Sequence, residues 1–169
     1  NEYKSLGCEK MNSGKEYEDL VKIVQEKVQQ VLEKTKKSNI TSLDLELSIK
    51  FSKASIRKAN ELGIKIVVAL ADKNGNLTLL NRMGDSLIAS IELAQKKAYT
   101  SVVLNMCTSE VSKSGLVGIV SSMEGKIVSF GGGIPIKNNE KLIGGIGISG
   151  GTVEQDIEIA QYAINAVLG

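Results

Sequence analysis

The sequence predicts an α/β domain in which a mostly antiparallel sheet of about five strands is covered by helices on both faces, with an amphipathic helix in front of it. Three observations predict this class. Segments with helical apolar periodicity alternate with short apolar runs, the short runs pair across turns of the Asn-Gly or Glu-Gly type, and 169 residues suit one domain with a short appendage. The expected order is helix, helix, hairpin, helix, hairpin, strand, helix.

The N-terminal region, residues 1–38, is expected to be a tail followed by one amphipathic helix, and residues 39–169 to be the domain. Residues 1–14 are polar and lack periodicity, and Ser13–Glu16 resembles a capping box. The helix ends near Lys37, and its apolar residues share one face: Tyr17, Leu20, Val21, Val24, Val28, Val31 and Leu32. Such a helix either packs on its own domain or binds a partner.

A second helix is predicted from Thr41 or Ser42 to Leu62, where Gly63 stops it. It carries two nearly opposite apolar stripes, one with Leu43, Leu47, Phe51 and Ala54 and the other with Leu45, Ile49, Ile56 and Ala59. A helix that is apolar on two sides is covered on two sides. The sheet takes one stripe, and the first helix or another subunit takes the other.

Residues 64–71 form an apolar run, and residues 77–82 return as its hairpin partner after a turn at Asp72–Gly75. A third helix is predicted over residues 86–106, where Ala94 and Ala98 would let a sheet approach closely. A second hairpin is expected from residues 116–123 and 126–130 around Glu124-Gly125.

The last strand is expected over residues 142–148 and the last helix directly after it. Thr152 and Gln155 have capping-box spacing, and Glu154 and Asp156 suit the first turn of a helix. The buried face of this helix is expected to hold Val153, Ile157, Ala160, Ile164 and Leu168.

Residues 145–150, which span the end of this strand and the start of the following turn, spell G-x-G-x-x-G, the dinucleotide-binding fingerprint. That motif requires a second parallel strand after its helix, and the 18 residues after Gly151 suffice for the helix alone. Two interpretations remain open. Alternate glycines let a helix or a neighbouring subunit lie against the strand. Alternatively, backbone N–H groups at the start of the last helix hold a carboxylate or phosphate.

Composition argues against several functions. The net charge is only +2, with four tyrosines, two phenylalanines and no cluster of basic and aromatic residues, so nucleic-acid binding is not expected. No apolar run approaches the roughly 20 residues of a membrane span.

The chain has no histidine, which disfavours independent catalysis and a metal site but leaves Arg, Lys and Asp chemistry open. Cys8 and Cys107 are expected to be free thiols in a reducing cytoplasm.

Four motifs in order carry a resemblance: Arg82-Met83, SIELAQKKAYTS at 90–101, KIVSFGGGIPI at 126–136 and IGGIGISGGTVEQDIEIAQ at 143–161. Over residues 43–168 the chain resembles the family that includes GlcG, the HbpS-type haem-binding proteins and the C-terminal domain of PduO-type corrinoid adenosyltransferases. The resemblance implies a profilin-like α/β/α domain that forms homo-oligomers and binds haem or a corrinoid such as cobalamin. An adenosyltransferase domain is not expected in the preceding 42 residues.

The resemblance and the helix start together suggest a ligand-binding set: Arg82, Asp85, Lys97, Thr100, Gly132, Gly133, Pro135, Gly150, Gly151 and Thr152. Arg82, Asp85 and Lys97 are the leading candidates, because the two cations could clamp the carboxylates of a ligand. The alternatives are that Arg82 and Lys97 are solvated or salt-bridged and that Asp85 only favours a helix N-terminus. Asp156 also matches the family, and it too could act only at a helix start.

The chain departs from the family pattern at two places. Gly84 separates Met83 from Asp85, and Asn76 stands where relatives often have histidine. Histidine ligation of haem is therefore impossible, and Met83, Cys107 or a tyrosine would have to replace it, although Met83 also suits packing.

The predicted function is an oligomeric binding protein for haem, a corrinoid or another anionic small molecule in corrinoid-dependent diol or ethanolamine metabolism. An accessory enzyme of cobalamin metabolism and a structural cargo protein of a bacterial microcompartment are the alternatives. The N-terminal helix resembles encapsulation peptides, so residues 17–37 could bind a shell or enzyme partner and place the cytoplasmic protein inside a microcompartment.

Overall fold

The computed structural model describes residues 15–38 and 40–169, which belong to two units. The first unit contains α1, Lys15–Ser38. Its large apolar side chains are exposed: Tyr17, Leu20, Val21, Ile23, Val24, Val28, Val31 and Leu32. The expected tail of residues 1–14, with Cys8 and the start of the expected capping box, lies outside the described residues. Neither α1 nor any other helix in the described residues is long and apolar enough to cross a membrane.

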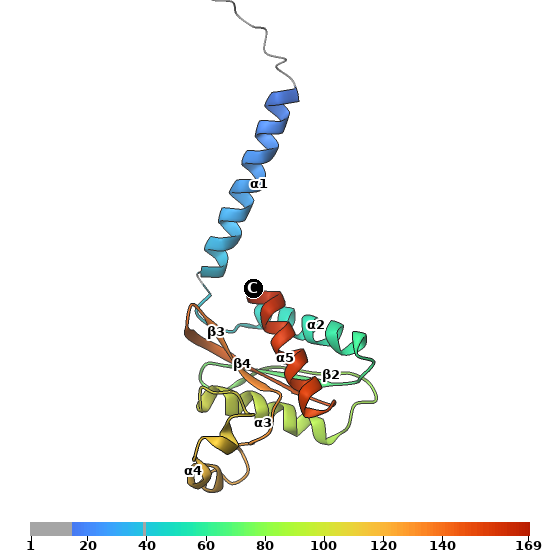
Figure 1. Cartoon of the computed structure of the whole chain (residues 1–169), viewed down its shortest axis with the longest axis vertical. Helices are drawn as coiled ribbons and strands as arrows, with labels where there is room; N and C mark the ends of the chain where they lie inside the picture. Colours follow the sequence, from blue (N-terminus) through green and yellow to red (C-terminus); the bar gives the residue numbers. More distant parts are fainter. Residues whose placement is uncertain (1–14, 39) are drawn as a thin grey trace, which may run out of the picture. The chain divides into compact units, whose positions relative to one another are not determined.

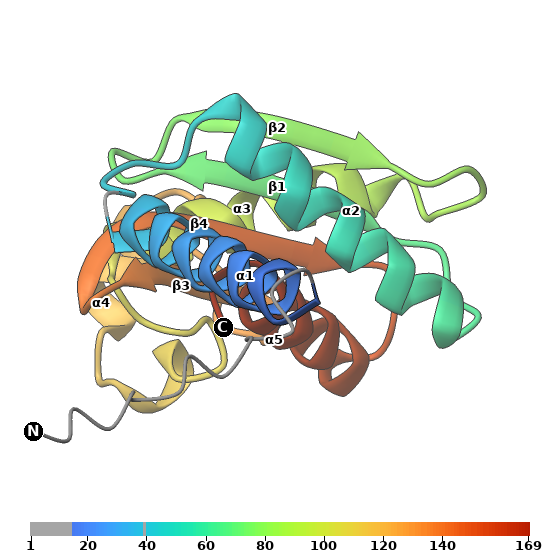
Figure 2. The same ribbon diagram turned by 90° about the horizontal axis from the view of Figure 1, so that it is seen from above.

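The second unit begins at Ile40 and has three layers. Its helices are α2 (Leu45–Glu61), α3 (Ala89–Val103), α4 (Val117–Ser122) and α5 (Val153–Leu168), with a 3-10 turn, η1, at Val111–Lys113. Its strands are β1 (Val67–Asp72), β2 (Leu77–Arg82), β3 (Gly133–Asn138) and β4 (Lys141–Ser149). The strand order is β2-β1-β4-β3, and all neighbours are antiparallel. Helices α2 and α5 cover one face and α3 the other (Figures 1 and 2). The expected fold class is confirmed, with four strands in place of about five.

β1 lies at the centre of the sheet and explains the continuous apolar run in the sequence. Its side chains alternate between two cores, so both faces of the strand are buried. Val67, Ala69 and Ala71 pack towards α3, whereas Val68 and Leu70 join the core beneath α2 and α5. The first hairpin, with its turn between Asp72 and Leu77, is confirmed.

The second hairpin predicted from the sequence is wrong. Residues 117–122 form α4, and no strand is formed over 126–130. The partner of β4 is instead β3, joined through Asn139 and Glu140, whose positive φ angles of 47° and 63° suit a two-residue hairpin turn. A short apolar run cannot be assigned to helix or strand by periodicity alone. Pro135 lies within β3, and proline is tolerated there because β3 is an edge strand.

Helix boundaries follow local capping. The carboxylate of Asp44 accepts a hydrogen bond of 2.8 Å from the Leu47 N–H, so α2 begins later than Thr41 or Ser42. Gly63 follows the end of α2 with φ of 69°, as expected. α3 is shorter at both ends than the predicted 86–106. The capping box at Thr152 is confirmed.

The alternate glycines of β4 let α3 lie directly on the sheet. A Cβ atom on Gly147 would come within 2.5 Å of the Ala98 nitrogen, and one on Gly145 within 2.7 Å of Val102. Ala94 and Ala98 are fully buried at this contact. The packing interpretation of the G-x-G-x-x-G sequence is therefore confirmed, and the approaching element is a helix of the same chain.

Candidate functional site

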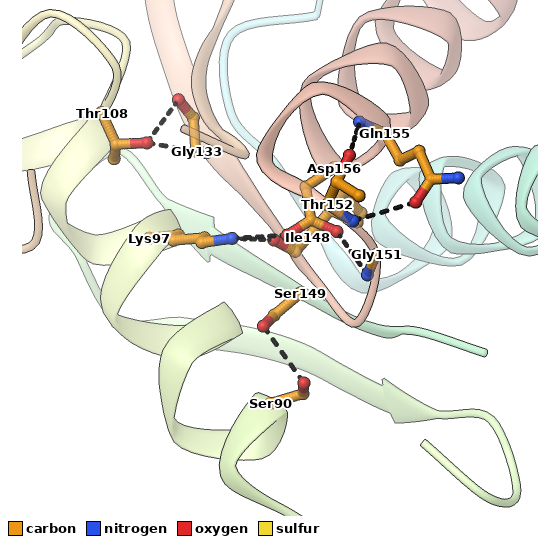
Figure 3. A network of polar contacts seen from close by, with 10 residues as sticks. All are labelled: Ser90, Lys97, Thr108, Gly133, Ile148, Ser149, Gly151, Thr152, Gln155 and Asp156. Atoms are coloured by element: carbon orange, nitrogen blue, oxygen red, sulfur yellow. Dashed lines mark hydrogen bonds and ion pairs between the residues drawn. The ribbon is translucent and has the colours of Figure 1, made fainter. Parts of the chain in front are cut away.

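The buried end of Lys97 lies where α3, β4 and α5 meet (Figure 3). Its ammonium donates hydrogen bonds of 2.7 Å to the Ile148 carbonyl and 2.7 Å to the Asp156 carboxylate. The other oxygen of Asp156 accepts a 3.0 Å hydrogen bond from the Gly151 N–H. The side chains of Lys97 and Asp156 are only 2% and 4% exposed. This ion pair therefore joins the two helix layers through the sheet.

Burial raises the pKa of the Asp156 carboxyl, while the hydrogen bond and charge of Lys97 and the Gly151 N–H act in the opposite direction. Gly132 closes the site, because a Cβ there would come within 2.8 Å of the Lys97 ammonium. The ring centroid of Phe130 lies 5.2 Å from the same ammonium. In this conformation Lys97 is fully engaged inside the protein and does not present its charge at the surface.

At the start of α5, the N–H groups of Gly151, Thr152 and Gln155 donate to side chains of the same segment. Gly151 donates to Asp156, and Thr152 donates to the side chain of Gln155 at 2.9 Å. The hydroxyl of Thr152 accepts from the Gln155 N–H at 3.3 Å. The expected cradle for a ligand carboxylate at Gly151 and Thr152 is thus filled by the chain's own side chains, because Asp156 folds back onto the helix start. Gly150 precedes it with a positive φ of 144°.

Arg82 and Lys97 are not brought together. Arg82 ends β2 on the surface, where its guanidinium donates a 2.7 Å hydrogen bond to the Ser86 carbonyl. Lys97 points towards β4 and α5, and β1 lies between β2 and β4 in the sheet. The two-cation clamp predicted from the sequence is therefore not formed within one chain. Asp85 is exposed in the following turn with φ of 64°, and α3 begins four residues later.

The remaining predicted residues have structural contacts. Thr100 is buried, and its hydroxyl accepts a 3.1 Å hydrogen bond from the Val128 N–H, which fixes the loop after α4. The N–H of Gly133 donates to the Thr108 hydroxyl at 2.9 Å. Pro135 is half-buried in the edge strand β3, opposite Gly145.

A surface pocket lies between the first hairpin and α3, away from this polar junction. Its volume is about 200 Å³. The hairpin contributes Ala71, Gly75 and Leu77, and α3 contributes Gln95, Lys96 and Tyr99. Lys126, from the loop after α4, completes the lining. The pocket combines an apolar and aromatic wall with two cations, which suits a flat ligand that carries a negative charge.

Lys96, Tyr99 and Lys126 were not among the candidates predicted from the sequence. All three lie within the motifs at 90–101 and 126–136, but only the fold shows that they meet at the hairpin turn. Arg82 lies five residues along β2 from Leu77, which corresponds to roughly 17 Å of extended strand. Arg82 and the pocket are therefore separate places on the surface.

The comparisons with known proteins identify the family. Residues 43–165 match the family described as haem degrading protein HbpS-like. The corrinoid adenosyltransferase PduO of Citrobacter freundii is 41% identical over 131 residues, which are 75% of this chain and 39% of that protein. The chain thus spans about two-fifths of the length of this curated relative.

Two solved structures share the fold of the second unit. A structure of a PduOC–haem complex has a TM-score of 0.71 and 41% identity, covering 75% of this chain and 95% of that chain. A double mutant of HbpS from Streptomyces reticuli has a TM-score of 0.69 and 30% identity, covering 76% and 88%. On the family match and these likenesses, the chain belongs to the HbpS-like family.

Proposed function

We propose that this protein binds haem or a related anionic small molecule as a homo-oligomer and acts in corrinoid-linked metabolism. The observation that carries the proposal is the 41% identity to the chain solved as a PduOC–haem complex, of which 95% is covered. The link to corrinoid metabolism rests on the PduO relative, whose length is matched only in part.

The residues fit haem as a carboxylated ligand better than as a histidine-ligated one. The chain has no histidine. Tyr99 lines the pocket and offers an aromatic side chain against which a flat ring system can pack. Burial, followed by the charge of Glu110, raises the pKa of the Cys107 thiol, so it stays protonated at neutral pH and is a poor ligand. Lys96 and Lys126 can pair with the propionate groups, which would be the main source of affinity.

A titration with haem, followed by visible absorption, tests the proposal. We expect saturable binding at one haem or fewer per chain, and a spectrum that changes when imidazole is added, because the protein supplies no imidazole of its own. A parallel titration with cobalamin separates haem from corrinoid ligands. Absence of saturable binding in both titrations would refute the proposed function.

A partner-binding role is the second candidate, and the exposed apolar face of α1 favours it. Val24, Val28 and Val31 are 52%, 52% and 62% exposed on one side of the helix. The apolar clusters that form the core draw their residues from Ile40 onwards. A microcompartment shell protein or a cargo enzyme would cover α1 in this proposal, and the protein would then be placed inside a microcompartment as cargo.

Deletion of residues 1–38 tests this second role. The truncated protein should keep its haem affinity and melt within a few degrees of the full chain, because the core lies in the second unit. A fusion of residues 15–38 to a fluorescent protein should co-sediment with purified shells, and a Val24→Glu, Val28→Glu fusion should not. A large loss of stability on deletion would mean that α1 belongs to the core.

A further inference from the structure

We propose that the pocket between the first hairpin and α3 binds the carboxylate-bearing edge of a flat aromatic ligand, with Lys126 and Lys96 at the carboxylate and Tyr99 against the ring. This inference rests on the proposed ligand binding and adds its place, its size and its residues. The pocket is the meeting point of the β1–β2 turn, the middle of α3 and the loop after α4.

The two charged residues that line the pocket, Lys96 and Lys126, are both cations. Lys96 is held by Glu92 on the preceding turn of α3, with 2.6 Å between nitrogen and oxygen. Lys126 forms no ion pair with any described residue. The nearby Asp72 carboxylate is directed into the hairpin turn, where it accepts hydrogen bonds from Asn74 and Asn76. Glu92 thus holds Lys96 in position, whereas the charge of Lys126 remains available to an incoming anion.

The aromatic wall is held in place by the turn. Gly75 packs so closely on the ring of Tyr99 that a Cβ there would lie 3.1 Å and 3.2 Å from two ring carbons. The positive φ of Gly75, 86°, is required by the same turn. The Tyr99 hydroxyl has no hydrogen-bond partner among the described residues. The turn therefore packs against one side of the Tyr99 ring, and the Tyr99 hydroxyl is available to a ligand.

The volume decides the ligand size. About 200 Å³ is less than the 300–1,000 Å³ typical of pockets that enclose drug-sized ligands. A bicyclic aromatic acid fits such a space, whereas a tetrapyrrole would enter with only one propionate-bearing edge. The shared chemistry is a carboxylate attached to a flat ring system, supplied either by a free aromatic acid or by that edge of a tetrapyrrole.

The test uses 2-naphthoate as the probe and the full-length protein, by calorimetric titration at fixed salt. The wild type should bind naphthoate and bind neutral 2-naphthamide much more weakly. Lys126→Glu should weaken naphthoate binding on the order of ten- to a hundredfold, because it removes one charge-assisted contact and adds repulsion. Tyr99→Leu should weaken both probes. Lys53→Glu, an equal charge change on α2, should leave the affinity unchanged. Equal naphthoate affinity in wild type and Lys126→Glu, or no binding by the wild type, would overturn the proposal.

A haem titration of the same variants and of Arg82→Ala distinguishes the two sources of the carboxylate. If haem displaces naphthoate and is weakened by Lys126→Glu, the tetrapyrrole edge occupies the pocket. If naphthoate binds as expected and haem does not bind at all, the pocket is a binding site for a free aromatic acid. The proposed haem binding is then wrong. If haem binds, is weakened only by Arg82→Ala, and naphthoate shows no dependence on Lys126, the site lies at the far end of β2 and the pocket proposal is wrong.

Discussion

The buried ammonium group of Lys97 connects α3 with β4 and α5. A buried ion pair need not stabilise a fold relative to apolar residues, because desolvation of both charges offsets their attraction. Removal of one partner is different, since it leaves the other charge buried and uncompensated. Lys97 and Asp156 are therefore expected to be strongly coupled in stability, whatever the net contribution of the pair.

We predict that Lys97→Met destabilises the protein by about 3–5 kcal/mol, because Asp156 then loses its partner in a buried site. The double variant Lys97→Met, Asp156→Leu should recover part of this loss, which makes the two changes non-additive. Urea unfolding of the single and double variants measures both effects. Lys53→Met, on an exposed lysine, should stay within about 0.5 kcal/mol of the wild type. Additive losses would show that the pair is not coupled.

The hairpin turn gives a pH prediction. Partial burial acts to raise the pKa of Asp72, but its hydrogen bonds to Asn76 and Asn74 outweigh burial and hold the pKa below its ordinary value. A lowered folded-state pKa gives stability that is present above the unfolded value of about 4 and is lost as pH falls through the folded value. The Tm difference between wild type and Asp72→Asn should therefore shrink steadily as pH falls from about 5 to about 2. A constant difference over this range would contradict the prediction.

At the scale of elements, the contact between α3 and β4 depends on the absence of side chains. Gly145 and Gly147 project no side chain towards α3, and Ala94 and Ala98 project only methyl groups towards β4. Because the helix backbone itself lies against the strand, neither partner can move aside without displacing Lys97 and Thr100, which fix α3 to α5 and to the loop after α4.

We predict that Gly147→Ala costs at least about 2 kcal/mol, since the added methyl group would overlap the backbone at Ala94 and Ala98. Gly118→Ala is the matched control. That glycine is exposed in α4, and nothing lies within 4 Å of its added Cβ. Alanine there should be neutral or slightly stabilising, because it favours the helix. Chemical denaturation of both variants gives the comparison, and equal stabilities would show that α3 can shift outwards at little cost.

At the scale of the whole molecule, apolar side chains remain uncovered on the second unit. Leu43, which precedes α2, and Leu47 and Phe51 are buried. Of the second stripe, Ala59 is buried, but Leu45 and Ile49 are 59% and 37% exposed. The sequence predicts that the first helix or another subunit packs on this second stripe. Exposed apolar surface of this kind is typical of contacts between subunits.

We therefore predict a homo-oligomer with a mass several times 18.1 kDa by light scattering at micromolar concentration. Leu45→Glu combined with Ile49→Glu should lower the mass, because charges would be buried at the contact. Lys50→Glu, on the same exposed part of α2, controls for a change of charge alone. A monomeric wild type would remove the basis for this prediction.

The sequence by itself determined the layers and most of the elements. Periodicity and capping residues are local signals, so α1, α2, α5 and the first hairpin followed from them. The family resemblance, carried by motifs over residues 82–161, gave the three-layer fold. The misassigned segment, 116–138, lacks local signals that separate helix from strand, and Pro135 fits a strand only because that strand lies at an edge of the sheet.

The roles of the candidate residues were decided by the tertiary structure alone. The local sequence around Lys97 is compatible with either an exposed or a buried ammonium. The ammonium is buried because Asp156, 59 residues away in the sequence, packs beside it and accepts its hydrogen bond. The same carboxylate fills the helix start that the sequence offered to a ligand. Tyr99 and Lys126 line the same pocket only because the hairpin turn and the loop after α4 meet beside α3. Local patterns specify elements, whereas a binding site depends on which distant side chains the packed layers bring together.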